Sequence, residues 1–284
     1  MGQSKQAADQ WPDGKLGVYP IQSVKTAAPQ LMNPDPAALL DVRFRRALAH
    51  ALDRDSLNDL INVGVAPPPA GFLVPVGAPE YPALKPSIVE YPYDLRRATQ
   101  LIEEVGFTRV GDGYRDATGK ELVVPFVTVG GGAEEQSALF LADGWKRAGV
   151  KTELDIRAQL EREDRAVRPG FTDGTGTFMM TQPGRLTWMH SDSIPTPANR
   201  FRGNNRSRYA NPELDALIDR FFITVPPTER IAVLGRIAHI VTDQVTQILT
   251  YHTMHAALIN NKAKNVTPRT GLAQTWDSHL WDLE

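Results

Sequence analysis

The sequence holds one pair of side chains whose types and spacing would suit a metal ion. His252 and His255 lie three residues apart beside Tyr251, and His239 precedes them. On a helix this spacing would bring both imidazoles to one face, where they could share a metal. Residues 248–259 instead read as extended chain, in which an odd spacing sends the two side chains to opposite faces. We therefore predict no metal site at this pair.

Motifs for covalent catalysis or phosphate binding are missing. The chain contains no G-x-S-x-G, H-E-x-x-H, Walker A or EF-hand pattern. Gly174-Thr175-Gly176 lacks the third glycine of a dinucleotide fingerprint, and Gly130-Gly131-Gly132 has no lysine or hydroxyl placed for phosphate. Because there is no cysteine, thiolate metal sites and thiol nucleophiles are also excluded. We predict no catalytic residue and no cofactor, and a protein that is not an enzyme.

Composition and charge restrict the partners. Hydrophobic residues make up 42% of the chain and charged residues 23%, which is typical of a globular fold. The formal net charge of -2 supplies no basic field for nucleic acid. No apolar run approaches the roughly 20 residues of a spanning helix, and the opening MGQSKQAADQWPDGK has no apolar core of a signal peptide. We expect no nucleic-acid partner and no membrane insertion.

Helices are predicted wherever apolar residues recur at three- and four-residue spacing after a capping residue. Asp41, Asp94 and Asn211 are the clearest N-caps, and Pro212 follows Asn211 at the first helical position. The predicted helices lie in DVRFRRALAHAL, in DSLNDLIN, in YDLRRATQLIEEVGF, around residues 138–148, after Asn211 and after Pro227.

Strands are predicted between these helices. DGYRDATGKELVVPFVTV reads as a hairpin that leads into a strand, in which Pro125 marks an edge or a bulge. Residues 150–156 alternate in polarity, residues 178–181 are apolar, and residues 1–40 read as a weakly extended connection. The many prolines of residues 65–93 predict a loop without regular helix. Strand, helix and strand in succession predict an α/β layer.

Four segments resemble, in order, those of the bacterial extracellular solute-binding proteins of family 5, the peptide/nickel type. DVRFRRALAHALDRDSLNDLINVGVA resembles the family's D-V-R-x-R-x-A-L-x-x-A-[IL]-D-R signature. YPYDLRRATQLIEEVGF, DGYRDATGKELVVPF and NNRSRYANPELDALID are similar to a helix, a hairpin and a Y-x-N-P element of the family. The resemblance covers roughly residues 9–284.

The resemblance implies an α/β fold of the periplasmic-binding-protein-like class, made of the second lobe and a partial return to the first. It places a hinge or first-lobe connection at residues 1–33, the second ligand-binding lobe at 34–250, and the return segment at 251–284. It also implies the substrate-binding component of an ABC importer, the C-terminal portion of a periplasmic or extracellular protein. Its partners would be a peptide or small-molecule solute, held in an interlobe cleft, and the cognate ABC permease.

Two segments depart from the family pattern. Peptide-binding members carry an acidic residue in a G-W-x-x-D-Y-P-x-P stretch, where this chain reads MMTQPGRLTWMHSD without a carboxylate at the matching place. The P-x-[IL]-P-L stretch before the last strands is replaced by TQILT. The first departure questions recognition of a peptide amine in the manner of dipeptide binders.

The implied ligand-binding residues lie in the long polar loop that would face the cleft. Trp and Tyr offer flat apolar area with a polar tip, and Arg and amides supply donors, as a polar solute requires. The residues are Gln182, Trp188, Arg200, Asn204, Asn205 and Tyr209. In the alternative interpretation the aromatic residues only anchor the loop and Arg200 pairs with a surface acid. An α/β hydrolase-like enzyme and a non-binding structural fragment remain the alternative functions.

Overall fold

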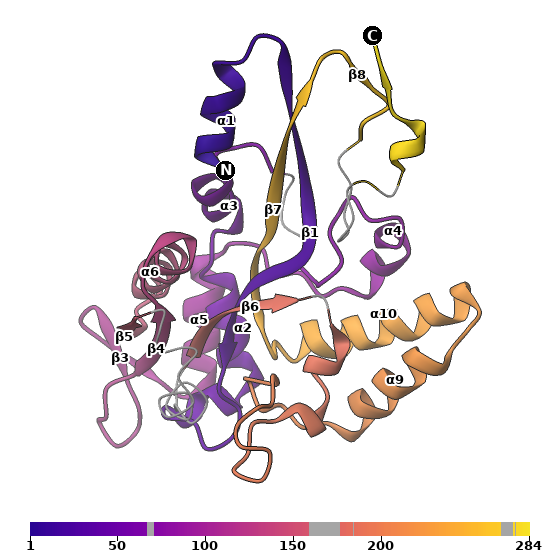
Figure 1. The fold of residues 1–284 in the computed structure, drawn as a ribbon. Coiled ribbons are helices and arrows are strands. Elements are labelled where there is room, and N and C mark those ends of the chain that lie inside the picture. The colour runs from indigo at the N-terminus through magenta and orange to yellow at the C-terminus, as the bar shows by residue number, and fades with distance from the viewer. Residues whose placement is uncertain (67–70, 159–176, 184, 268–274, 276) are drawn as a thin grey trace.

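The computed structural model describes residues 1–66, 71–158, 177–183, 185–267, 275 and 277–284, with side chains left out for residues 21–22 and 177–183. The chain is a mixed α/β structure (Figure 1). Its helices are α1 (Gly2–Asp9), α2 (Val42–His50), α3 (Arg54–Asn62), α4 (Tyr81–Leu84), α5 (Leu95–Val105), α6 (Gly132–Arg147), α9 (Pro212–Ile223) and α10 (Pro227–Asp243). Its strands are β1 (Gly14–Pro29), β2 (Thr108–Val110), β3 (Gly113–Arg115), β4 (Val123–Val129), β5 (Lys151–Arg157), β6 (Thr177–Pro183), β7 (Ile248–Asn260), β8 (Ala263–Lys264) and β9 (Asp282–Leu283).

The main sheet has five strands in the order β5-β4-β6-β1-β7. The pairs β4–β5 and β4–β6 are parallel, whereas β1 runs antiparallel to both β6 and β7. The parallel half therefore comes from neighbouring segments joined by α6, and the antiparallel half joins segments from the two ends of the chain. This mixed sheet agrees with the α/β class predicted from the sequence.

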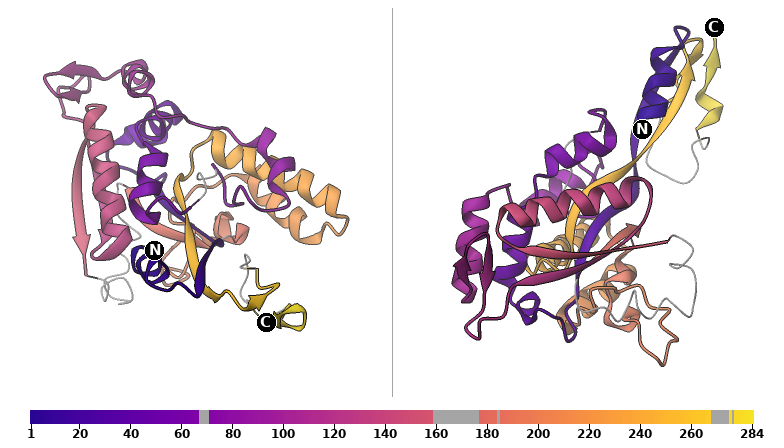
Figure 2. Two further views of the ribbon diagram at one scale, coloured as in Figure 1. Left: turned by 90° about the horizontal axis from the view of Figure 1, so that it is seen from above. Right: turned by 90° about the vertical axis from the view of Figure 1, so that its left-hand side faces the viewer.

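Each face of the sheet is covered by its own helices (Figure 2). On one face α2, α5 and α6 enclose a core in which Trp145 packs against Phe126, with ring centroids 5.1 Å apart. On the other face α4, α9 and α10 enclose a second core around Phe72. Neighbouring residues of β7 divide between them, because Ile248 belongs to the first core and Leu249 to the second. The sheet is thus the middle of three layers.

The predicted helix starts are confirmed at the three clearest caps. The carboxylate of Asp41 accepts the backbone N–H of Arg43, and the carboxylate of Asp94 accepts that of Arg97. The amide oxygen of Asn211 accepts two N–H groups of the first turn of α9. These side chains satisfy donors that have no partner inside the helix, which is why local sequence locates them well.

Three expectations need correction. The weakly extended connection predicted for residues 1–40 contains the full 16-residue strand β1, and it also contains the helix α1, which was not predicted. The proline-rich region 65–93 contains the short helix α4, with Pro82 in its first turn, where no N–H is required. Pro125 lies in the interior strand β4; among the described residues β6 pairs with β4 at Phe126 and Val127 only, and the described partner of Pro125 is Glu153 of β5.

β1 and β7 form a long antiparallel ribbon that extends beyond the layered body (Figures 1 and 2). Their pairing runs from Gly14↔Asn260 to Ala27↔Ile248, with an irregularity between Pro20 and Val24. α1 lies beside the outer part of the ribbon and buries none of its residues, and β8 and β9 lie on the opposite side of the ribbon (Figure 1). Within the described residues, no helix has both the length and the apolar character needed to cross a membrane.

Candidate ligand-binding site

Two arginines of the segment that resembles the family signature, Arg45 and Arg46, are bonded to the chain itself. The guanidinium of buried Arg45 donates to the carbonyls of Leu39, Leu40 and Gln244 at 2.6–2.9 Å. Arg46 donates to the Asp243 carboxylate at 2.6 Å. These side chains tie α2 to the end of α10, and they are not directed at a solute.

The loop that follows β6, residues 185–211, is organised around Asn205. Its side chain is 2% exposed, and its Nδ2 donates to the carbonyls of Met189, His190 and Tyr209 at 2.9–3.2 Å. Asn205 therefore joins the two arms of the loop. This contact supports a structural role for Asn205, one of the six residues expected to contact ligand.

Among the described side chains of the other five predicted residues, no hydrogen bond or ion pair joins one to another. Gln182 pairs through its backbone with Val24 of β1, and its side chain lies outside the described part of the structure. Trp188 is half-buried in the 3₁₀ turn Leu186–Trp188, and the hydroxyl of half-buried Tyr209 accepts a bond from Asn211 at 2.9 Å. Arg200 is exposed and Asn204 half-buried.

Arg200 forms no ion pair with any residue the structure describes, so the expected alternative, pairing with a surface acid, is not seen there. Its backbone lies in the left-handed region, with φ of 54°, and its amide donates to the carbonyl of Pro197. The tight turn holds Arg200 at the surface with its guanidinium available. Which of the six residues contact a solute remains a prediction.

The first turn of the loop borders a cavity of about 700 Å³. Arg185, Leu186 and Thr187 form one wall, and the end of α9 and the start of α10 form another. Most of the lining is apolar, including Phe72, Leu73, Phe221, Phe222, Ile231 and Leu234. Trp188 is not part of the lining. The cavity offers volume for an apolar side chain, with Arg185 and Arg230 at its walls.

One serine, histidine and aspartate of the loop region lie close together but do not form a nucleophile and base. The Ser191 hydroxyl donates to the Asp215 carboxylate, which also accepts the Ser191 backbone N–H at 2.9 Å. Nδ1 of His190 accepts the N–H of Asp192 at 3.1 Å. A nucleophile would require the serine proton to face the imidazole. The contacts instead fix the start of the 3₁₀ turn Ser191–Ser193 against α9.

Polar groups on the ribbon were missed from sequence. Lys25 of β1 forms an ion pair with Glu134 in the first turn of α6, and both side chains are 13% exposed. On the paired strand, Tyr251 shares a hydrogen bond of 3.2 Å with Ser137, and burial raises the pKa of its hydroxyl to about 12. The signal in the sequence was Lys25 directly before the small residues Thr26, Ala27 and Ala28, which indicate a buried strand. A lysine buried there requires a charged partner.

The two histidines of β7 lie in different environments, as their odd spacing predicted. His252 is 6% exposed, and neither ring nitrogen has a hydrogen-bond partner in the described structure. Burial lowers the pKa of its imidazole to about 4. His255 is exposed and packs edge-on against Tyr19. Among the described residues, no group of three or more His, Asp or Glu side chains is placed to hold a metal ion.

Sequence comparison decides the family. Residues 6–196 match the family described as "Bacterial extracellular solute-binding proteins, family 5 Middle". This chain belongs to that family. Comparison with curated proteins gave no match. The resemblance found in its signature segment is confirmed.

Solved structures of family 5 type share the fold. The oligopeptide-binding protein of Thermus thermophilus, complexed with a pentapeptide, is 20% identical with a TM-score of 0.73, covering 93% of this chain and 47% of its own. NikZ of Campylobacter jejuni with Ni(L-His) is 17% identical with a TM-score of 0.75, covering 99% and 56%. AppA of Bacillus subtilis with a nonapeptide is 16% identical with a TM-score of 0.74, covering 99% and 55%.

The chain thus spans about half the length of these structural relatives. Their coverage agrees with the predicted fold class, a periplasmic-binding-protein-like α/β fold of which this chain has a part. At these identities the likeness concerns the fold, so the ligands of the relatives are not transferred with it.

Proposed function

We propose that the chain is the C-terminal portion of the substrate-binding component of an ABC importer, which captures an oligopeptide or another small polar solute between two lobes. The observation that carries the proposal is the β1–β7 ribbon, which leaves the layered body and bears the first and last segments of the chain at its outer end (Figure 1). Two antiparallel strands crossing between lobes are suited to a hinge, because they join the lobes without a large interface.

In this proposal residues 34–250 form the second ligand-binding lobe. Residues 1–33 lead into it from the first lobe, and residues 251–284 return to the first lobe. Each inner strand end is tied to the second lobe: Lys25 of β1 is paired with Glu134, and Tyr251 of β7 with Ser137. Bending would then concentrate at the irregular pairing between Pro20 and Val24, where the ribbon lacks regular register.

The loop 185–211 supplies the ligand wall of the second lobe. Asn205 fixes its shape from inside, whereas Arg200 is exposed and Trp188 and Asn204 are half-buried. A preorganised loop with an aromatic ring and a free guanidinium is suited to a solute that has apolar and acceptor groups. The protein would act in the periplasm or outside the cell, deliver solute to a cognate permease, and carry out no catalysis.

The proposal is tested by titrating the longest natural form of the protein with peptides of three to nine residues, followed by tryptophan fluorescence and calorimetry. We expect a micromolar or tighter complex, and an affinity at least about 100-fold weaker for residues 1–284 alone, since one wall leaves half of the ligand in water. Absence of peptide binding by the long form, or serine-dependent turnover of peptide or ester substrates, would contradict the proposal.

A further inference from the structure

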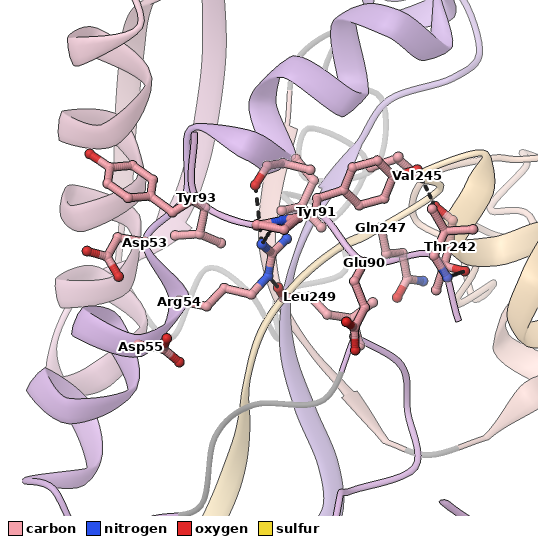
Figure 3. A pocket seen from close by; sticks show the side chains of 16 residues that line it. Asp53, Arg54, Asp55, Glu90, Tyr91, Tyr93, Thr242, Val245, Gln247 and Leu249 are labelled. Carbon is pink, nitrogen blue, oxygen red and sulfur yellow. Dashed lines mark hydrogen bonds between the residues drawn. The ribbon is translucent and has the colours of Figure 1, made fainter. Parts of the chain in front are cut away.

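A second cavity, of about 260 Å³, lies away from the loop 185–211 and contains none of its residues (Figure 3). Three segments enclose it: the junction of α2 and α3, residues 89–93, and the passage from α10 into β7. Arg54 enters from the α3 side, and Glu90 and Gln247 lie across from it (Figure 3). Its volume is below the usual range of roughly 300–1,000 Å³ for drug-sized ligands, so it suits a smaller molecule.

Arg54 presents a charged donor that its neighbours do not use fully. Its Nε donates to the carbonyl of Leu249 at 2.9 Å, and its Nη1 donates to those of Tyr91 at 2.8 Å and Ala49 at 3.3 Å. Nη2 has no partner in the described structure. Burial lowers the pKa of the guanidinium to about 10, which still leaves it protonated at neutral pH. The planar group is held by carbonyls and retains one donor nitrogen for an anionic oxygen.

Gln247 presents the opposite requirement. It is 4% exposed, lines the same cavity, and its Oε1 has no hydrogen-bond partner within the described residues. A buried acceptor without a hydrogen bond destabilises the fold, because it has lost its bonds to water and gained none in return. Thr242, on the same wall, is already engaged, since its hydroxyl donates to Ala238 and accepts from Val89. The Gln247 amide oxygen is therefore a polar group of this wall that has no donor among the described residues.

The charges around the cavity indicate whether its ligand is a simple anion or a zwitterion. Glu90 and Asp55 are exposed at the lining, and neither forms an ion pair with a described residue. Asp53 adds a third carboxylate, which caps α3 through Ser56. Three carboxylates beside one guanidinium repel a simple anion. A ligand that also carries a cationic donor satisfies both the acceptors and Arg54.

We propose that this cavity binds a small zwitterion of the size of a free amino acid, with its carboxylate on Nη2 of Arg54 and its ammonium group between Gln247 and Glu90. The site is independent of the solute cleft proposed above, because it shares no residue with the loop 185–211. It adjoins Gln247, Ile248 and Leu249, at the start of the ribbon strand β7. Binding would therefore join α3 to the base of the ribbon.

The test is calorimetric titration of the natural protein with each of the twenty standard amino acids at up to about 10 mM. Sodium acetate and methylammonium chloride, which carry only the carboxylate or only the ammonium group of an amino acid, serve as half-ligands. We expect at least one amino acid to bind with a submillimolar Kd, and each half-ligand to bind at least about 30-fold more weakly. If acetate alone binds as well as the best amino acid, the site is an anion site and the zwitterion assignment is wrong.

Two variants locate the binding without disturbing Arg54. Gln247→Leu removes the unpaired acceptor at similar volume, and Glu90→Gln removes one exposed charge; both should weaken the amino acid at least about tenfold. Gln100→Leu, an exposed glutamine on α5 that bonds Glu104, is the matched control and should leave the Kd unchanged. Absence of amino-acid binding, or an equal Kd in both cavity variants and the parent, would overturn the proposal. Peptide titration of the same samples reports separately on the solute cleft.

Discussion

The signature segment, residues 41–54, and the loop 185–211 both contain several arginines and aspartates or asparagines, and they use them differently. In the signature segment Arg45 is bonded to three backbone carbonyls and Arg46 to Asp243. In the loop, the amides of Asn199 and buried Asn205 donate to backbone carbonyls, whereas Arg200 is exposed. The loop thus combines side chains that hold its own fold with one that remains available at the surface.

The difference has a physical origin in what each segment joins. α2 must be held against the end of α10, which comes almost 200 residues later, and a guanidinium has five donors with which to reach several carbonyls at once. The loop joins β6 to α9 over a short sequence distance, so short-range bonds from neutral side chains such as Asn199 and Asn205 hold it. A residue type that looks functional in sequence can therefore be entirely structural.

The largest expected effect is on Arg45. Arg45→Met keeps the apolar stem but leaves the carbonyls of Leu39, Leu40 and Gln244 without their donor, which should lower the free energy of unfolding by about 4 kcal/mol. Urea unfolding monitored by circular dichroism measures it. Arg200→Met is the matched control and should unfold like the parent. Equal stability of the two variants would remove the distinction between the segments.

The next effect concerns a buried polar side chain that has no partner in the described structure. The pKa of His252 is lowered to about 4 in the fold, against about 6.5 in an unfolded chain, so the unfolded state binds the proton more readily between these values. Stability is full above pH 6.5 and should fall by about 3 kcal/mol as the pH decreases to 4. Other groups titrate in this range, so the test is a difference between variants.

His252→Leu should remove that part of the pH dependence, whereas the same change at exposed His255 should retain it. The measurement is urea unfolding of the parent and both variants at pH 7 and at pH 4.5. If the His252 variant loses as much stability on acidification as the parent, the imidazole finds a partner or water that the structure does not hold. In that case His252 would be hydrogen-bonded in the fold, as Arg45 is.

Features formed by residues close together in the sequence could be predicted, whereas features formed by distant segments could not. Asp41, Asp94 and Asn211 cap helices through contacts two or three residues away, so their positions were read correctly. β1 was predicted only as a weakly extended connection because its partner β7 lies more than 200 residues away, and because Gly14, Pro20 and Ala27 give it no clear alternation. α1 buries none of its residues, so no apolar periodicity marked it.

The same reasoning applies to the site. Sequence directed attention to the loop, but it could not show that Asn205 faces inward while Arg200 faces outward. The cavity at Arg54 was invisible, because residues 49–55, 89–93 and 242–249 meet only in the folded chain. Arg54 itself was noticed as part of the signature motif, not as a donor in a cavity.

A smaller effect is expected at Trp188, and it is on binding. If its ring lies against solute in the complete two-lobe protein, Trp188→Ala should weaken the best peptide by about 1–3 kcal/mol, which corresponds to roughly 5- to 150-fold in Kd. Trp188→Phe should retain most of the affinity, since it keeps a flat apolar ring. Unchanged affinity in a stably folded Trp188→Ala protein would show that the ring only anchors the loop, as the alternative interpretation holds.

The smallest effect is expected at the boundary where the loop ends and the scaffold resumes. The amide oxygen of Asn211 accepts the N–H groups of Glu213 and Leu214 at 2.9 and 3.1 Å, and its nitrogen donates to the Tyr209 hydroxyl. Asn211→Ala leaves these donors at the start of α9 unpaired and should cost about 1 kcal/mol in urea unfolding. Asn211→Ser keeps a capping oxygen and should recover most of that loss.

The control is Asn204, a half-buried loop asparagine whose side chain has no bond to a described residue. Asn204→Ala should leave the free energy of unfolding unchanged. If Asn204→Ala costs as much as Asn211→Ala, the outer loop is as structural as its base, and its residues are poor candidates for contacting solute.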